Sequence, residues 1–352
     1  MNAGKKTLLV LSPGFAESEA DTSCLPAQQS LVRCCNHLFP DIHFIILSFQ
    51  YPYTKQPYQW YGNTVIPFNG RNRGKLFRLL TWVRVWYTLK RLLKQEQILG
   101  ILSFWLGECA LVGYYFSKRN KLLHYTWLLG QDARKGNPYA RRIPLQANSL
   151  IAVSDFIAQH FFENYAIRPF HVIPNAIDPS LYENVKTVKD IDIIGVGSLI
   201  PLKQFAVFIE VIKSLYIDFP GLKVIICGKG PEQGNLEKQI KQYGLENTIE
   251  LAGVKKHEEV LKLMQRSRVM LHTSSYEGFS GACLEALYAG AHVVSFLNPV
   301  NGWINHWHIV KNKEEMIEKT NTLLTLRDLD HHAVLAFPME ETARLMMQLF
   351  TG

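Results

Sequence analysis

Short apolar segments alternate with longer amphipathic segments along the chain, most regularly in its second half. Apolar runs of four to six residues are typical of buried strands, and apolar positions three or four apart are typical of helices. This alternation predicts an α/β fold with parallel sheets covered by helices on both faces. In the second half we expect strands at Ile191–Val196, Leu222–Cys227, Ile249–Ala252, Val269–Thr273 and His292–Phe296, and helices at Gln204–Phe219, Glu232–Tyr243, His257–Arg266 and Ser280–Ala289.

The first half repeats the alternation less regularly. Its apolar runs predict a second sheet, and three amphipathic segments predict helices beside it. The strands are expected at Thr7–Leu11, His43–Phe49, Ile98–Ser103, Leu122–Trp127, Ser149–Val153 and His171–Ile173, and the helices at Leu25–Leu38, Leu76–Lys94 and Asp155–Tyr165.

The chain has 352 residues, 47% of them hydrophobic, which excludes a disordered chain and fits two domains. We expect a domain over 1–179, a linker over 180–190, a domain over 191–335, and a helix over 336–352 able to pack back toward the first domain. No stretch approaches the roughly 18 apolar residues of a membrane span, and Thr7–Leu11 is too short for a signal peptide. The six cysteines lack zinc-finger spacing, which favours a reducing, cytoplasmic location.

Charge is divided unevenly along the chain. Residues 1–175 carry a net charge of +11 and residues 176–352 a net charge of −3, within a total of +8. A basic half suggests an anionic partner: nucleic acid, a membrane surface or a phosphorylated substrate. The alternative is that the unequal net charge of the two halves only aids solubility.

Glycine or serine follows most of the expected strands of the second half. In parallel sheets, ligands bind outside the carboxyl ends of the strands. Glu277 lies in such a turn, and Glu285 lies in the next helix, whose N-terminus can receive phosphate or sugar oxygens. Lys203 follows the turn Gly195-Val196-Gly197-Ser198 and can neutralise a phosphate. Taken singly, each of these residues also fits an ordinary surface position.

Together the segments resemble a known family. Val-Ile-Pro-Asn-Ala-Ile-Asp at 172–178, Gly-x-Gly-Ser-Leu with Lys203, Gly-Lys-Gly-Pro at 228–231, and Glu277-Gly-Phe-Ser with a second glutamate eight residues later occur in one order. This order is similar to that of the family-4 retaining glycosyltransferases, also called glycosyl transferases group 1. The resemblance implies the GT-B architecture, in which two Rossmann-like domains face a cleft.

The resemblance also implies roles for individual residues. Glu277, Lys203 and Asp132 would act in catalysis, with Glu277 facing the donor sugar and Lys203 holding the diphosphate. Asp132 belongs to Gly130-Gln131-Asp132, similar to the end of a His-Gly-x-Asp segment. Glu285 would bind the nucleotide ribose. The remaining donor contacts implied by the resemblance are Gly14, Ser198, Gly230, Gly278, Phe279 and Ser280.

Two positions depart from the family pattern. Ser198 stands where an arginine is common, and Leu129 replaces the histidine of His-Gly-x-Asp. Either change alters donor preference, weakens activity, or is compensated by Arg134, Lys135 or Lys229. We expect compensation.

The motifs favour transfer without a metal ion or other cofactor. The pairs His306/His308 and His331/His332 lack partnering acids at ligand spacing, so we interpret them as packing or surface histidines. No motif supplies a carboxylate nucleophile, which favours attack on the same face as the leaving diphosphate.

Residues 71–94 hold eight lysines and arginines and no acid, interleaved with tryptophan, tyrosine and leucine. This composition is typical of a helix that lies on an anionic membrane. A buried helix with outward-reaching cations is equally compatible, and nucleic acid is disfavoured because no nucleic-acid motif accompanies the charge.

The sequence therefore predicts a retaining glycosyltransferase that moves a sugar from a nucleotide-sugar donor to a glycan or lipid-linked acceptor in surface polysaccharide biosynthesis. It would work in the cytoplasm or at the inner face of the membrane. The alternatives are a catalytically weak partner protein that binds nucleotide sugars, and a nucleotide-sugar epimerase of the same architecture.

Overall fold

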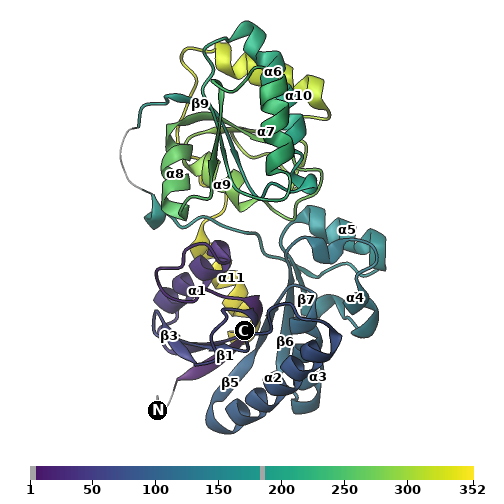
Figure 1. The fold of residues 1–352 in the computed structure, drawn as a ribbon. Helices are drawn as coiled ribbons and strands as arrows, with labels where there is room; N and C mark the ends of the chain where they lie inside the picture. Colours follow the sequence, from purple (N-terminus) through teal and green to yellow (C-terminus); the bar gives the residue numbers. More distant parts are fainter. Residues whose placement is uncertain (1–4, 183–186) are drawn as a thin grey trace. The chain divides into compact units, whose positions relative to one another are not determined.

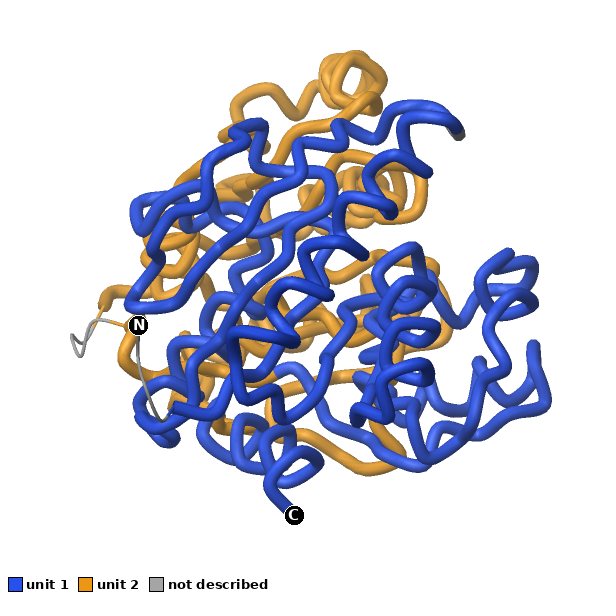
Figure 2. Tube along the Cα trace, turned by 90° about the horizontal axis from the view of Figure 1, so that it is seen from below, with its two compact units in different colours: residues 1–175, 339–352 blue, residues 176–338 orange. Residues whose placement is uncertain are grey.

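The computed structural model describes residues 5–182 and 187–352. The chain divides into two compact units, coloured separately in Figure 2: unit 1 holds residues 1–175 and 339–352, and unit 2 holds residues 176–338. The expected linker over 180–190 is not a separate spacer. Its residues 183–186 lie outside the described residues, while Tyr182 and Lys189 belong to unit 2, where they donate hydrogen bonds to the carbonyls of Glu285 and Ala289.

Unit 1 is built on a sheet whose described strands run in the order β3-β4-β2-β1-β5-β6-β7-β8. All neighbouring pairs are parallel except β3 with β4, which form a hairpin at one edge. The strands are β1 (Lys6–Gly14), β2 (Ile42–Tyr51), β3 (Tyr58–Trp60), β4 (Asn63–Pro67), β5 (Gln97–Phe104), β6 (Leu123–Leu128), β7 (Leu150–Ala152) and β8 (His171–Val172).

Helices cover both faces of this sheet. Helices α2 and α3 share a core with one face, in which Val85 and Phe116 meet Ile101 of β5. Side chains alternate along a strand, so Gly100 faces the other side, where Phe350 of α11 lies against it. The last helix therefore packs on unit 1, beside α1 (Figure 1). The helices are α1 (Pro26–Leu38), α2 (Lys75–Gln95), α3 (Glu108–Asn120), α4 (Pro138–Arg142), α5 (Asp155–Tyr165) and α11 (Met339–Thr351).

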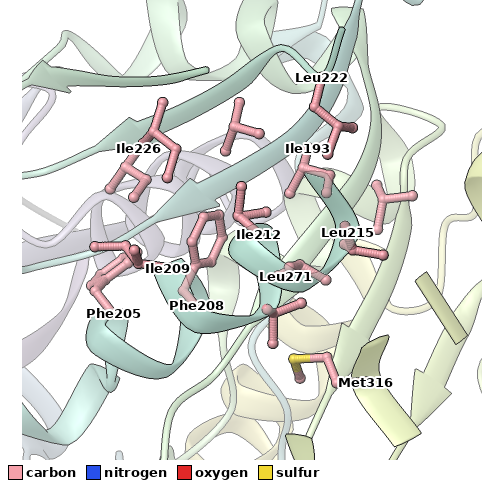
Figure 3. Packing of buried hydrophobic residues seen from close by; sticks show 14 of the residues in the cluster. Ile193, Phe205, Phe208, Ile209, Ile212, Leu215, Leu222, Ile226, Leu271 and Met316 are labelled. Carbon is pink, nitrogen blue, oxygen red and sulfur yellow. The ribbon is translucent and has the colours of Figure 1, made fainter. Parts of the chain in front are cut away.

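Unit 2 has an entirely parallel sheet in the order β11-β10-β9-β12-β13-β14 among its described strands. One face packs against α6, α7 and α10, as the labelled side chains of Figure 3 show for part of this core. The elements are β9 (Ile191–Val196), α6 (Phe205–Asp218), β10 (Val224–Cys227), α7 (Gln233–Gln242), β11 (Ile249–Gly253), α8 (His257–Arg266), β12 (Ser267–His272), α9 (Gly281–Tyr288), β13 (His292–Ser295), β14 (Trp307–Ile309) and α10 (Lys313–Thr325).

The predicted α/β class with two parallel sheets is confirmed. The expected strands and helices all form, with ends that move by a few residues. The prediction omitted α3, α4, α10, β14 and the β3–β4 hairpin. Helix α3 reads Glu-Cys-Ala-Leu-Val-Gly-Tyr-Tyr-Phe, a sequence without a clear polar face, and β14 is only three residues long.

Phe350 provides a test of the packing of α11. Its ring is 5% exposed and lies 5.2 Å from that of Tyr125, centroid to centroid. Phe350→Ala should lower the free energy of unfolding of unit 1 by about 3 kcal/mol, because it removes a buried aromatic ring. Leu345→Ala on the same helix, where the side chain is 39% exposed, should cost less than about 1 kcal/mol. Urea denaturation of both variants measures the difference, and equal losses would contradict this packing.

Candidate functional site

Glycines bring two turns of unit 2 into direct contact at the carboxyl edge of its sheet. Gly197 follows β9 and Gly228 follows β10, with φ angles of +152° and +149°. A Cβ on Gly228 would lie 1.8 Å from the Gly197 carbonyl oxygen, and one on Gly230 would lie 2.2 Å from that of Leu199. The Leu199 amide also donates to the Lys229 carbonyl at 3.0 Å. Only glycine allows the two turns to pack this closely.

Backbone contacts then place Lys203 beside the segment that follows β12. Strands β9 and β12 are neighbours in the sheet. The Ser275 amide donates to the Leu202 carbonyl at 3.0 Å, and the Thr273 hydroxyl donates to the Lys203 carbonyl at 2.8 Å. As a result, the Lys203 ammonium forms an ion pair with the Glu277 carboxylate. The structure therefore joins two of the predicted residues, which lie 74 positions apart in the sequence.

His272, the last residue of β12, is a third charged group at this position. Its Nδ1 lies 3.0 Å from the Ser295 hydroxyl, and its Nε2 lies 3.8 Å from Glu277 Oε2, which is too long for a hydrogen bond. Burial opposes the charged imidazolium, but Cys283 and the Glu277 carboxylate outweigh it and raise the pKa of His272 to about 9. Burial also opposes the Glu277 carboxylate, but His272 and Lys203 lower its pKa to about 2.

These pKa values define the pH range in which the cluster stabilises the fold. The pKa of Glu277 is lowered, so its contribution is complete above its ordinary value of 4.5 and is lost as the pH falls toward 2. The pKa of His272 is raised, so its contribution is complete below 6.5 and is lost as the pH rises toward 9. Both contributions are present together between about pH 4.5 and pH 6.5.

Helix α9 begins directly after the Glu277 turn. The Ser280 hydroxyl caps it by accepting a hydrogen bond from the Cys283 amide at 3.3 Å. Gly278 and Phe279 are buried, and the Phe279 ring packs against Trp307 and Phe337 at centroid distances of 6.1 and 5.4 Å. The turn is therefore fixed, and the partial positive charge of the helix N-terminus lies beside Glu277.

Glu285 lies farther along α9 and has a partner that no sequence motif indicates. His257, the first residue of α8, places its Nε2 2.7 Å from Glu285 Oε1. Burial lowers the pKa of His257, but the Glu285 carboxylate outweighs burial and the net pKa is raised. His257 and His272 carry no motif. The available signal was position, since each lies at the carboxyl end of a strand or in the helix start that follows one.

Two predicted residues belong to unit 1. Gly14 ends β1, and a Cβ there would touch Cys24 Sγ at an ordinary 3.5 Å, so the fold alone does not require glycine. Asp132 lies just after β6 and is 6% exposed; it accepts a hydrogen bond from the Leu129 amide at 2.8 Å. Burial outweighs its backbone hydrogen bonds and raises the pKa of Asp132 to about 7. Both lie at the carboxyl edge of the unit 1 sheet.

The remaining predicted site residues belong to unit 2 and lie near the carboxyl ends of its strands. Ser198 is exposed next to Gly197, and Lys229 is exposed in the adjoining turn. The structure thus gathers the implied donor contacts of residues 190–300 at one edge: Ser198, Lys203, Gly230, Glu277, Gly278, Phe279, Ser280 and Glu285.

Solved structures of GT-B glycosyltransferases match this fold. TarM of S. aureus matches with a TM-score of 0.73 and 12% identity over 99% of both chains. HepE of Anabaena, solved with UDP and glucose, matches with a TM-score of 0.66 and 19% identity over 98% of this chain and 95% of HepE. The likeness establishes that the fold is GT-B.

Sequence comparison then shows a family similarity for most of unit 2. Residues 181–334 match the family model "Glycosyl transferases group 1", and the resemblance inferred from the motifs is confirmed for this part of the chain. A human phosphatidylinositol N-acetylglucosaminyltransferase component is 31% identical over 152 residues, which are 42% of this chain. The match spans 31% of the length of that relative.

The charged cluster provides a test of the site's geometry. Glu277→Gln should lower the pKa of His272 from about 9, because it removes the carboxylate that favours the imidazolium. Titration of histidine ring carbons by NMR measures this change. Glu237→Gln, at an exposed position of α7, should leave the value unchanged. An unaltered His272 pKa in the Glu277 variant would show that the two groups are not coupled.

Proposed function

We propose that this protein is a retaining glycosyltransferase that uses a nucleotide-sugar donor bound at the carboxyl edge of unit 2. The observation that carries the proposal is the cluster of Lys203, Glu277 and His272 at the N-terminus of α9, within a segment that matches the glycosyl transferases group 1 family. Partly buried opposite charges suit a reaction in which opposite charges separate.

The reaction creates the charges that this cluster can stabilise. As the anomeric C–O bond breaks, the sugar becomes positive and the diphosphate gains negative charge. Glu277 remains ionised at neutral pH, because its pKa is about 2, and would stabilise the sugar. Lys203 and the α9 N-terminus would stabilise the diphosphate. In this proposal, the ion pair between Lys203 and Glu277 breaks when the donor binds. Lys203 then contacts the diphosphate, and Glu277 contacts the sugar.

The exposed cation Lys229 is the candidate to replace the arginine that is common at position 198. The Leu199 amide donates to the Lys229 carbonyl, so the Lys229 turn adjoins Ser198 directly. A flexible ammonium there can reach a phosphate as a point charge, although it lacks the paired donors of a guanidinium. The family resemblance also implies roles for Asp132 and Gly14, which belong to unit 1.

Transfer would keep the anomeric configuration. The acceptor hydroxyl would attack the face from which the diphosphate leaves, and a diphosphate oxygen would take the hydroxyl proton. The C–O bond to the nucleotide breaks as the C–O bond to the acceptor forms. Lys203 and the helix amides can stabilise the negative charge that develops on the diphosphate. We therefore propose that transfer needs no metal ion or other cofactor.

The comparisons favour a UDP-linked donor and a lipid-bound acceptor. HepE was solved with UDP, and the human relative is named for transfer of N-acetylglucosamine to phosphatidylinositol. For this chain we propose a UDP-sugar, with UDP-N-acetylglucosamine as the first candidate. The acceptor would be a lipid-linked sugar or growing glycan for the cell surface, met at the cytoplasmic face of a membrane.

Donor turnover tests the proposed roles. Glu277→Gln and Lys203→Met should each lower the rate of sugar transfer or donor hydrolysis by about 100-fold or more, since each removes a charge that stabilises the transition state. The matched controls Glu237→Gln and Lys238→Met lie at exposed positions of α7 and should keep the wild-type rate. Thermal-shift titration with UDP measures donor binding separately.

The outcomes separate the alternatives. Wild-type turnover in Glu277→Gln would remove that residue from the mechanism. UDP binding by the wild-type protein without turnover of any UDP-sugar would favour a catalytically weak partner protein. Conversion of the donor to its epimer without an acceptor would favour an epimerase.

The surface of α2 supports a membrane-bound acceptor. Among the side chains of this helix that the structure describes, the buried ones are Thr81, Val85, Leu89 and Leu92, which lie along one side. The side chains of Arg84, Lys90, Arg91 and Lys94 are exposed. Apolar side chains between 50% and 69% exposed accompany them: Leu76, Phe77, Leu79, Leu80, Val83 and Tyr87.

A groove of about 370 Å³ lies between α2 and α3 and is lined mainly by apolar side chains, with Lys90 among them. Exposed apolar groups beside cations match the interface of an anionic lipid membrane, where headgroups meet acyl chains. Among the described residues, no helix combines the length and hydrophobicity needed to cross a membrane. We therefore propose that α2 lies on the membrane surface.

Vesicle sedimentation tests this surface. The protein should bind vesicles that contain phosphatidylglycerol more tightly than those of phosphatidylcholine alone. Replacing Lys90, Arg91 and Lys94 with glutamine should weaken binding about 100-fold, because each cation contributes about 1 kcal/mol. Leu76→Ser with Phe77→Ser should also weaken it. The control Ile217→Ser, at an 81% exposed position of unit 2, should bind vesicles as the wild-type protein does. Equal binding by all variants would remove α2 from the interaction.

A further inference from the structure

A cluster of histidines lies at the opposite edge of the unit 2 sheet from the donor site. His292 begins β13, and His306 directly precedes β14, so both lie at the amino ends of parallel strands. Their rings stack with a centroid distance of 4.1 Å. The segment after α10 is attached here, because the Asp330 carbonyl lies 2.7 Å from His292 Nε2 and the Gly290 carbonyl lies 2.8 Å from His331 Nδ1.

This attachment brings an acid and a second histidine to His306. Asp330 Oδ2 lies 3.8 Å from His306 Nε2 and 2.6 Å from His332 Nδ1. One nitrogen or oxygen atom from each of the three residues lies within 4.8 Å of the other two. The expectation that these histidines lack a partnering acid is therefore wrong. Asp330 and His332 are two positions apart, but spacing could not add His306 to the group, since α10 separates it from both in the sequence.

We propose that His306, Asp330 and His332 bind one divalent transition-metal ion of the zinc class. Two imidazole nitrogens and one carboxylate oxygen are a donor set that Zn²⁺, Co²⁺ and Ni²⁺ accept. With metal–ligand bonds of about 2.0–2.2 Å, ligand atoms of a tetrahedral site lie about 3.3 Å apart. The present separations reach that spacing through small movements of Asp330 and His332, whose side chains are 66% and 49% exposed.

The surroundings of His306 suit it to bind a metal ion. It is 6% exposed, and its Nδ1 has no hydrogen-bond partner among the described residues, while Nε2 faces Asp330. Its φ of +60° is uncommon for a residue with a side chain.

The site would be structural and separate from sugar transfer. It lies at the amino ends of the strands, whereas Lys203 and Glu277 lie at the carboxyl ends. A bound ion would fasten the segment after α10 to the start of β14. Trp307 follows His306 and packs against Phe279, so this tie supports the aromatic contacts behind the Glu277 turn.

Metal uptake by the whole protein, free of any affinity tag, tests the proposal. Equilibrium dialysis should give one Zn²⁺ per chain, and Co²⁺ should produce the visible absorption of a site with nitrogen and oxygen ligands. His332→Ala and Asp330→Asn should each weaken Zn²⁺ binding about tenfold or more, since each removes a ligand. Both side chains are exposed, so both variants should fold, and circular dichroism checks this. His37→Ala, an exposed histidine of α1, is the matched control and should bind like wild type.

Zn²⁺ should also raise the melting temperature of the wild-type protein and of His37→Ala more than that of the ligand variants. Failure of the wild-type protein to bind one ion per chain would overturn the proposal. Equal binding by wild type, His332→Ala and Asp330→Asn would overturn it as well. Neither result depends on donor turnover, so this proposal and the proposed function can fail separately.

Discussion

The ion pair between Lys203 and Glu277 is the interaction on which the proposed chemistry of unit 2 depends. Lys203 comes from the turn after β9 and Glu277 from the turn after β12, so the pair exists only because these strands are neighbours. His272 adds a second cation at 3.8 Å from the carboxylate. Partly buried charges are costly unless they are paired, and the cluster therefore constrains the ends of two strands as well as the site.

Close packing of the neighbouring turns holds this cluster in place. Gly228 and Gly230 allow the turns after β9 and β10 to touch, and a side chain at either position would collide with backbone. The hydrogen bonds of Ser275 and Thr273 to the Lys203 turn hold the third turn in place. Three strand ends thus pack together at one edge, beside which the N-terminus of α9 supplies positive potential. A diphosphate and a sugar require these features close together.

The sequence predicted the fold class and most strands, because the alternation of apolar strands and amphipathic helices is regular, above all after residue 190. It also indicated Lys203, Glu277 and Glu285, because their motifs keep a fixed order. It did not indicate His272, His257 or the group of His306, Asp330 and His332. Those residues carry no motif, and they meet only when parallel strands or a distant loop bring them together. Likewise, the exposure of Leu76 and Phe77 on α2 depends on which face of that helix the core covers.

The uneven net charge of the two halves of the chain corresponds to a difference between the two units. The acidic half contains the proposed donor site, where a few buried charges are paired locally. The basic excess lies in unit 1, and part of it follows the exposed surface of α2, which we assign to the acceptor's membrane rather than to the nucleotide.

The most direct measurement of donor binding at this edge of unit 2 is an NMR titration of the protein with UDP, which maps the amide signals that change. We predict saturable shifts for Gly197, Gly228 and Glu285 and for the residues of the Lys203 and Glu277 turns. Saturable shifts confined to other regions, or no shifts at millimolar UDP, would contradict a donor site at this edge.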